Sequence, residues 1–164
     1  MFRPRLLRIC AQVLLGLALG LRSDAAPKTV KENGGQANNN STYVENSSPG
    51  NSDTVKIDGN SKKVTLTDPL TEWGAVDFSA GSIEGNKKLS LSLSTSLWTG
   101  GVIDGATLST PGITISAGSE KKLQGAGQLE VLAGGSATWT GDDLVTGGGA
   151  EIKNAGTFTT NFGG

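Results

Sequence analysis

One short motif occurs twice in this chain, and its spacing limits the folds that the chain can adopt. Trp98-Thr99-Gly100 returns as Trp139-Thr140-Gly141, 41 residues later. The segments between the copies also pair, since residues 108–115 resemble residues 123–131. Self-similarity with a period of 20–50 residues is typical of solenoids, propellers and other arrays. Two turns of roughly 20 residues suit a β-solenoid coil of two or three short strands, and no helical or WD-type signature accompanies the motif.

Apolar residues alternate with polar residues from position 54 onward, which predicts half-buried strands. The clearest examples are Val55 and Ile57, Val64 and Leu66, and the run Leu89, Leu91 and Leu93. Asp58-Gly59-Asn60 lies between the first two pairs and predicts a turn. Glycines separate most of the short apolar runs and are too frequent for helices. We therefore expect an all-β fold in which stacked rungs of a parallel β-helix bury the apolar face of each strand.

This β-solenoid is expected over residues 54–164, with irregular first coils or a cap over 54–95 and regular coils over 96–164. An antiparallel β-sandwich is the alternative. The repeat pattern continues up to the last residues given, 161–164, and no polar cap follows it. That ending predicts a fragment of a longer protein, because an uncapped edge strand invites aggregation. The alternative is a short secreted protein whose end pairs with another copy.

The first residues predict export. Arg3, Arg5 and Arg8 precede an apolar run, residues 9–21, and small residues follow at 23–25. This order is the signature of a secretory signal peptide, here residues 1–25. Thirteen residues at about 1.5 Å rise span about 20 Å, short of the roughly 30 Å hydrocarbon core of a membrane. We expect a secreted protein, extracellular or at the cell surface.

Residues 26–53 are rich in asparagine, serine and glycine and hold few bulky apolar residues. Such a segment buries too little apolar surface to offset the entropy of ordering, so a disordered linker is expected. Asn39, Asn40 and Asn46 each begin an Asn-x-Ser/Thr sequon, which the sequence alone does not show to be used.

Residues 123–141 carry a family resemblance. They read LQGAGQLEVLAGGSATWTG and resemble the glycine-rich repeat of autotransporter passenger domains, in which a G-x-G-x-L-x-L strand precedes a T-(Y/W)-T-G segment. Residues 147–158, GGGAEIKNAGTF, are similar to a rung of large bacterial β-helix surface proteins. The chain departs from the repeat by an extra Gly135 and by the long stretch 142–148.

Over residues 98–158 the resemblance implies a right-handed parallel β-helix and a secreted or surface-displayed scaffold, often adhesive. Membrane attachment would have to lie in C-terminal sequence that this chain lacks.

Several chemistries lack their usual residues. The chain has no histidine, and its four arginines and single cysteine all lie in residues 1–25, so general bases, thiols and the best transition-metal ligands are missing beyond them. The remaining residues are acidic on balance, so nucleic acid is not an expected partner. No cofactor, metal ligand or catalytic residue is assigned.

The sharpest enzymatic hypothesis is a fragment of a pectinase-like β-helix. Asp142 and Asp143 follow Gly141, but neighbouring residues on a strand point to opposite faces and cannot form a carboxylate pair alone. Asp104 would have to join them. The preferred interpretation is a polar turn between rungs.

Three further patterns have a structural and a functional interpretation. Trp98 and Trp139 either pack inward or form an outward sugar platform. The oxygen-rich turns Asp58-Gly59-Asn60 and Asp142-Asp143 lack the spaced ligands of known calcium loops. The pairs Lys62-Lys63, Lys87-Lys88 and Lys121-Lys122 predict solvated turns rather than contacts to acidic glycans. The expected function is a structural or adhesive scaffold whose partners are glycans or other surface proteins, with the polysaccharide-active enzyme as the alternative.

Overall fold

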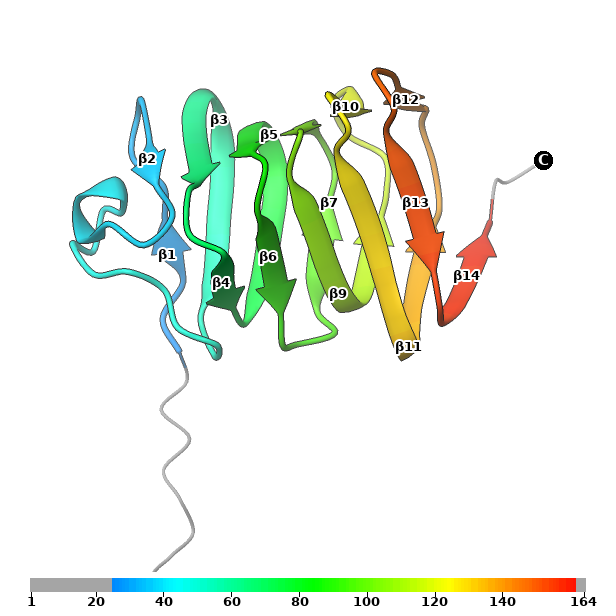
Figure 1. Cartoon of the computed structure of the whole chain (residues 1–164), viewed down its shortest axis with the longest axis horizontal. Coiled ribbons are helices and arrows are strands. Elements are labelled where there is room, and N and C mark those ends of the chain that lie inside the picture. Colours follow the sequence, from blue (N-terminus) through cyan, green and yellow to red (C-terminus); the bar gives the residue numbers. More distant parts are fainter. Residues whose placement is uncertain (1–24, 162–164) are drawn as a thin grey trace, which may run out of the picture.

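The computed structural model describes residues 25–161, and the predicted signal peptide falls almost wholly outside that range. The described chain is a single stack of β-strands that runs from β1 and β2 at one end to β13 and β14 at the other (Figure 1). Its elements are β1 (Lys28–Thr29), β2 (Gly35–Gln36), η1 (Asn40–Thr42), β3 (Thr54–Leu66), β4 (Leu70–Trp73), β5 (Ala75–Gly85), β6 (Lys88–Leu91), β7 (Ser96–Trp98), β8 (Gly101–Asp104), β9 (Thr107–Ile115), β10 (Lys121–Gln124), β11 (Gln128–Trp139), β12 (Leu144–Thr146), β13 (Glu151–Asn154) and β14 (Thr157–Thr160).

The strands stack as a parallel β-solenoid of about five turns, so the predicted fold class is confirmed. Every strand pair among the described residues is parallel, which excludes the alternative antiparallel sandwich. The one antiparallel contact is an isolated bridge between Val30 and Tyr43. Each coil passes over three faces, because long strands such as β3, β9 and β11 bend from one face to the next at a bulge or irregularity.

We name the faces by the order in which the chain visits them. Face I comprises β1, residues 54–57, residues 75–78, β7, residues 112–115, residues 136–139 and β14. Face II comprises β2, residues 63–66, residues 82–85, β8, β10 and β12. Face III comprises β4, β6, residues 107–110, residues 128–131 and β13.

The repeated tryptophan motif marks coils of this solenoid. Trp98 pairs with Ile115, and Ile115 pairs with Trp139, so the two motifs lie two coils apart on face I, as predicted. The predicted alignment of residues 108–115 with residues 123–131 is wrong. Leu108 pairs with Leu129 on face III, and Leu123 pairs with Ile103 on face II. The alternation of apolar residues is alike on all three faces, so residues from different faces resemble each other in sequence.

Inward side chains from the three faces form one continuous core. At its centre Phe78 and Trp98 are fully buried and stack, with ring centroids 6.2 Å apart. Leu89 and Leu91 of β6 are buried as the alternation predicts, but Leu93 is 39% exposed. The amides of residues 92 and 93 both donate to the carbonyl of Gly74, so the chain is already turning the corner there. Residues 54–95 form coils of the stack and not a cap, with the expected irregularity in the register between β3 and β5.

The prediction of disorder for residues 26–53 is wrong for the part that holds β1, β2 and η1. β1 and β2 pair with β3, and Val30, Ala37 and Tyr43 are buried in the core. The Tyr43 ring packs edge-on against Trp73, and its hydroxyl donates to the carbonyl of Ala37 at 2.6 Å. Val30, Ala37 and Tyr43 reach the core and cover the first coil in spite of the polar composition, whereas Val44 is exposed.

The three sequon asparagines hold the turns of this segment together. The side-chain oxygen of Asn39 accepts from the amide of Ser41 and caps η1, and that of Asn40 accepts from the amide of Ser48 at 2.7 Å. The side-chain oxygen of Asn46 accepts from the Lys31 ammonium at 2.8 Å. Asparagine side chains readily form such local bonds to turns, which explains their abundance without disorder.

Candidate functional site

The Gly141-Asp142-Asp143 stretch is a corner between β11 on face I and β12 on face II. Asp142 has a left-handed φ of 53°, and its carboxylate accepts a hydrogen bond from the amide of Gly118 at 2.8 Å. Gly118 lies in the corresponding corner of the preceding coil, between β9 and β10. Asp142 therefore links two neighbouring corners, and the preferred interpretation of a polar turn is confirmed.

The third acid of the enzymatic hypothesis lies elsewhere. Asp104 is the last residue of β8, and its carboxylate accepts from the Gln124 amide at 3.1 Å. β12, which follows the Asp142 corner, pairs through β10 with the beginning of β8, so Asp104 lies at the opposite end of face II from Asp142. Residues 25–161 hold no group of three or more acidic residues close enough to bind a metal ion. The structure thus does not bring the three aspartates together.

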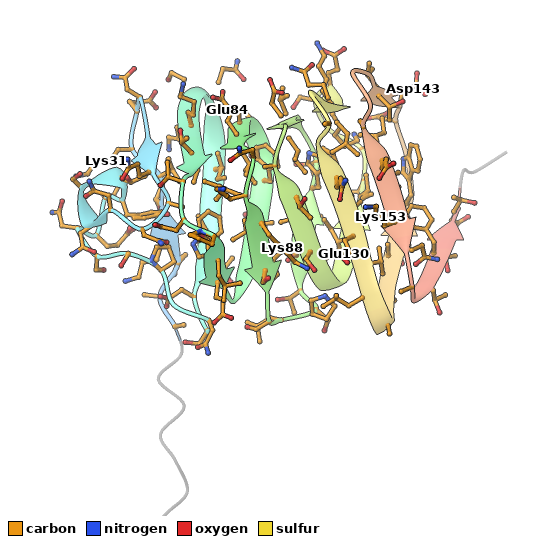
Figure 2. The ribbon with its side chains drawn as sticks, in the orientation of Figure 1. Lys31, Glu84, Lys88, Glu130, Asp143 and Lys153 are labelled. Carbon is orange, nitrogen blue, oxygen red and sulfur yellow. The ribbon has the colours of Figure 1, made fainter. Side chains whose placement is uncertain are left out.

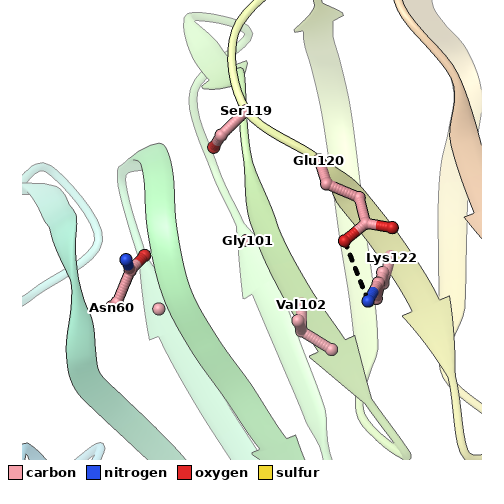
Figure 3. Close-up of a pocket in the computed structure, with 7 residues that line it drawn as sticks. Asn60, Gly101, Val102, Ser119, Glu120 and Lys122 are labelled. Carbon is pink, nitrogen blue, oxygen red and sulfur yellow. Dashed lines mark ion pairs between the residues drawn. The ribbon is translucent and has the colours of Figure 1, made fainter.

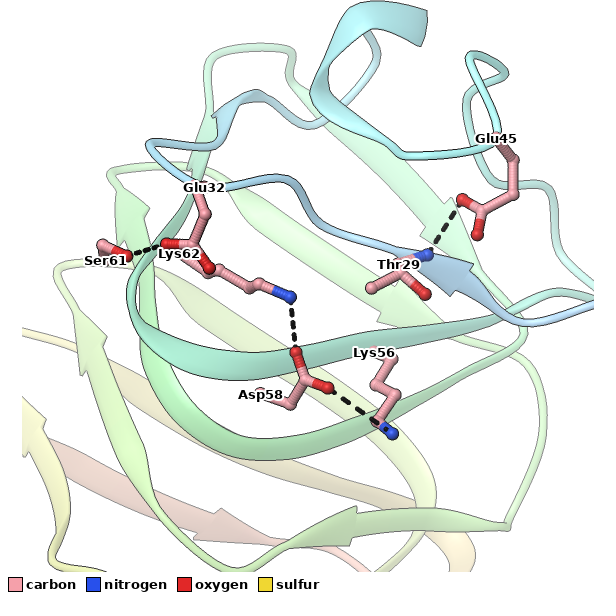
Figure 4. Close-up of polar contacts among 7 residues, drawn as sticks. All are labelled: Thr29, Glu32, Glu45, Lys56, Asp58, Ser61 and Lys62. Carbon is pink, nitrogen blue, oxygen red and sulfur yellow. Dashed lines mark hydrogen bonds and ion pairs between the residues drawn. The ribbon is translucent and has the colours of Figure 1, made fainter.

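Asp58-Gly59-Asn60 forms the predicted turn as a bulged corner within β3. Asp58 contacts two ammonium groups, that of Lys62 at 2.5 Å and that of Lys56 at 3.4 Å (Figure 4). The Lys62 contact in particular holds the pKa of Asp58 below its ordinary value. The carboxylate is thus engaged with lysines of its own strand.

The two tryptophans do not form an outward platform. Trp98 is fully buried, and Trp139 is partly buried and packs against the core. The indole N–H of Trp139 donates to the carbonyls of Gly141 and Asp142 at 3.1 and 3.0 Å. The inward interpretation is therefore confirmed, and Trp139 also fixes the acidic corner that follows it.

Most of the paired lysines lie at the surface in ion pairs. Lys63 contacts Glu84, and Lys88 reaches across the intervening coil to Glu130 at 2.7 Å (Figure 2). This contact holds the pKa of Glu130 below its ordinary value. Lys121 contradicts the prediction of solvated turns, because its whole side chain is buried. Its ammonium has one long contact, 3.4 Å, to the carbonyl of Ser119.

A regular row of polar side chains lies on the last coils of face I. Thr114 of β9, Thr138 of β11 and Thr159 of β14 occupy one register position on three successive coils and point outward. Further hydroxyl or amide side chains flank this row, namely Ser136 and Thr157 on one side and Ser116, Thr140 and Asn161 on the other. We call these eight residues the hydroxyl grid.

The hydroxyl grid contains no charged side chain, and the parallel stack sets the spacing of its members. Successive coils of a parallel sheet lie about 4.7–4.9 Å apart, and alternate residues of a strand lie about 6.6 Å apart. Within the described chain the hydroxyls of Thr114, Thr138 and Thr159 make no hydrogen bond, so they are available to a ligand. The sequence alone does not show which of these hydroxyl residues align, because coil lengths differ along the stack.

Comparisons with protein-family models, with curated proteins and with solved structures gave no match. Within residues 25–161 no helix is long and apolar enough to cross a membrane. The geometry of the described residues shows a β-helix scaffold fold.

Proposed function

We propose that this β-solenoid is a secreted or surface-displayed scaffold that adheres to glycans or to other surface proteins through the hydroxyl grid on face I. The observation that carries the proposal is the alignment of Thr114, Thr138 and Thr159, whose outward hydroxyls have no internal partner. An exposed hydroxyl both donates and accepts, so such a row suits partners with many hydroxyl or amide groups.

Single contacts of this kind are weak, and repetition compensates for that. A net gain of roughly 0.5–1.5 kcal/mol per hydrogen bond gives little affinity alone. Several contacts at fixed spacing act together, because the first contact raises the effective concentration for the next. A rigid parallel stack keeps that spacing without further loss of conformational entropy.

The test is retention of the full chain on immobilised polysaccharides and glycans, with Thr114→Val/Thr138→Val as the variant. Valine keeps the shape and β-propensity of threonine but has no hydroxyl. We expect the parent chain to be retained by at least one of these ligands and the variant to bind it about tenfold more weakly.

Thr65→Val/Thr107→Val is the matched control, because these threonines lie on faces II and III. Its binding should equal that of the parent chain. If no ligand retains the chain, or if both variants lose binding equally, adhesion through the hydroxyl grid is refuted.

A further inference from the structure

A pocket of about 250 Å³ lies at the corner between faces I and II, and none of the eight residues of the hydroxyl grid lines it. Asn60 lines one side, Glu120 and Lys122 line the other, and Gly101 and Val102 lie between them (Figure 3). Small-ligand pockets usually measure roughly 300–1,000 Å³, so this one suits a single small molecule or one residue of a longer chain.

Unequal corners create the pocket. The corners at residues 58–62 and 116–120 are long, whereas those of the two coils between them, residues 79–81 and 99–100, are short. The two long corners project from the stack and form the walls of the pocket. The two short corners between them project less and form its floor. The long corner 116–120 is fixed in place, since the Ser119 hydroxyl donates across Gly100 to the carbonyl of Ser79 at 2.9 Å.

The two glycines of the floor have no room for a side chain. Gly81 and Gly101 have φ values of 86° and 95°, in the left-handed region that favours glycine. A Cβ at Gly101 would lie 2.5 Å from the buried ring of Phe78. Backbone and the Val102 side chain therefore form the floor, and polar groups surround it.

The polar groups at the rim are available to a ligand. Within residues 25–161 the Asn60 amide makes no hydrogen bond. Glu120 and Lys122 pair with each other at 2.9 Å, with side chains 60% and 36% exposed. Because so exposed an ion pair contributes little to stability, a ligand can share its oxygen and ammonium groups at small cost.

We propose that this pocket binds one residue of a neutral sugar. The carboxylate of Glu120 accepts from sugar hydroxyls, the ammonium of Lys122 donates to sugar oxygens, and the Asn60 amide does both. Val102 packs against the C–H groups of the ring. The single acid and single base of the lining neutralise each other, so no ionic ligand is favoured. The pocket is independent of the hydroxyl grid.

The test uses the full chain labelled with ¹⁵N and titrated with glucose, galactose and N-acetylglucosamine, followed by amide chemical shifts. We expect at least one sugar to give saturable shifts at Gly101, Val102 and the Asn60 side-chain amide. Asn60→Ala and Glu120→Ala should each weaken that binding about tenfold, since each removes hydrogen bonds to the sugar.

Glu151→Ala is the matched control, because Glu151 also forms an exposed pair with a lysine two residues away, Lys153 of β13. This variant, and Thr114→Val/Thr138→Val, should bind the sugar as the parent chain does. Absence of saturable shifts with all three sugars overturns the proposal. So does binding that survives both pocket variants. Glucuronate is titrated in the same way, and saturable shifts with glucuronate but with none of the three neutral sugars also overturn the proposal.

Discussion

Replacing Tyr43 tests whether the asparagine-rich N-terminal segment is folded onto the solenoid. Tyr43 is fully buried, packs edge-on against Trp73 and donates to the Ala37 carbonyl at 2.6 Å. Truncating a buried aromatic residue to alanine typically costs about 3–5 kcal/mol. Tyr43→Phe keeps the ring and should cost about 1 kcal/mol, the net value of one hydrogen bond.

The loss of stability caused by Tyr43→Ala should be confined to the first coil, because each coil of a solenoid contacts only its neighbours. Tyr43→Ala should release the first coil before the rest of the stack unfolds. The amides of Val30 and Ala37, which donate to the Lys56 and Thr65 carbonyls, should then exchange with solvent faster by a factor of 100 or more. Hydrogen exchange monitored by NMR measures this directly.

The Tyr43 hydroxyl gives a second signature, in its pH dependence. Burial raises its pKa above the ordinary value of 10.0. Its contribution to stability is fully present below pH 10 and is lost as the pH rises toward the folded-state pKa. Tyr43→Phe should remove this part of the alkaline destabilisation. If Tyr43→Ala changes neither the unfolding free energy nor the exchange of Val30, the segment is not packed as described.

Three further predictions concern the charged residues. Lys121→Met should raise the unfolding free energy in urea by about 1–3 kcal/mol, because a buried ammonium with one long contact is costly to desolvate; a loss of stability would contradict this. Lys88→Met should raise the pKa of Glu130 toward 4.5, measured by carboxyl NMR, and cost under about 1 kcal/mol at pH 7. That cost should disappear as the pH falls through the folded-state pKa of Glu130, since protonation removes the ion pair; a pKa that does not move would refute the contact. Asp142→Ala should lower stability by about 1 kcal/mol through the lost bond to Gly118, and neither it nor the parent should release reducing ends from pectin. Depolymerisation that is lost in Asp142→Ala would favour the enzyme.

The sequence predicts the class of fold because the alternation and the repeated tryptophan motif are local signals. Trp98 and Trp139 mark coils directly, whereas the length of the coil between them depends on loops that have no fixed length. The N-terminal segment is mispredicted because its order depends on long-range pairing with β3 and on three apolar residues that reach the core.

The candidate sites were harder to predict for the same reason. The row through Thr138 requires the register of three coils, and the pocket beside Asn60 requires knowing which corners are long and which are short. The number of residues between successive glycine-containing corners is uneven. This is the one signal in the sequence that could have indicated a pocket beside Asn60. The Lys121-Lys122 pair predicts a solvated turn, but both residues lie on β10, where neighbouring side chains point to opposite faces and one of the two is therefore buried.

Distances along face I test the parallel stack most directly. Lys56, Asp77, Leu97, Thr114, Thr138 and Thr159 occupy one register position on successive coils. Spin labels can be placed at Thr159 and at Thr114, Asp77 or Lys56, in a chain whose single cysteine, Cys10, is replaced by serine. At about 4.7–4.9 Å per coil, pulsed electron resonance should give backbone separations of about 10, 19 and 24 Å, apart from a constant label contribution. Separations that do not increase in this order, by about 4.7–4.9 Å for each added coil, would contradict the solenoid.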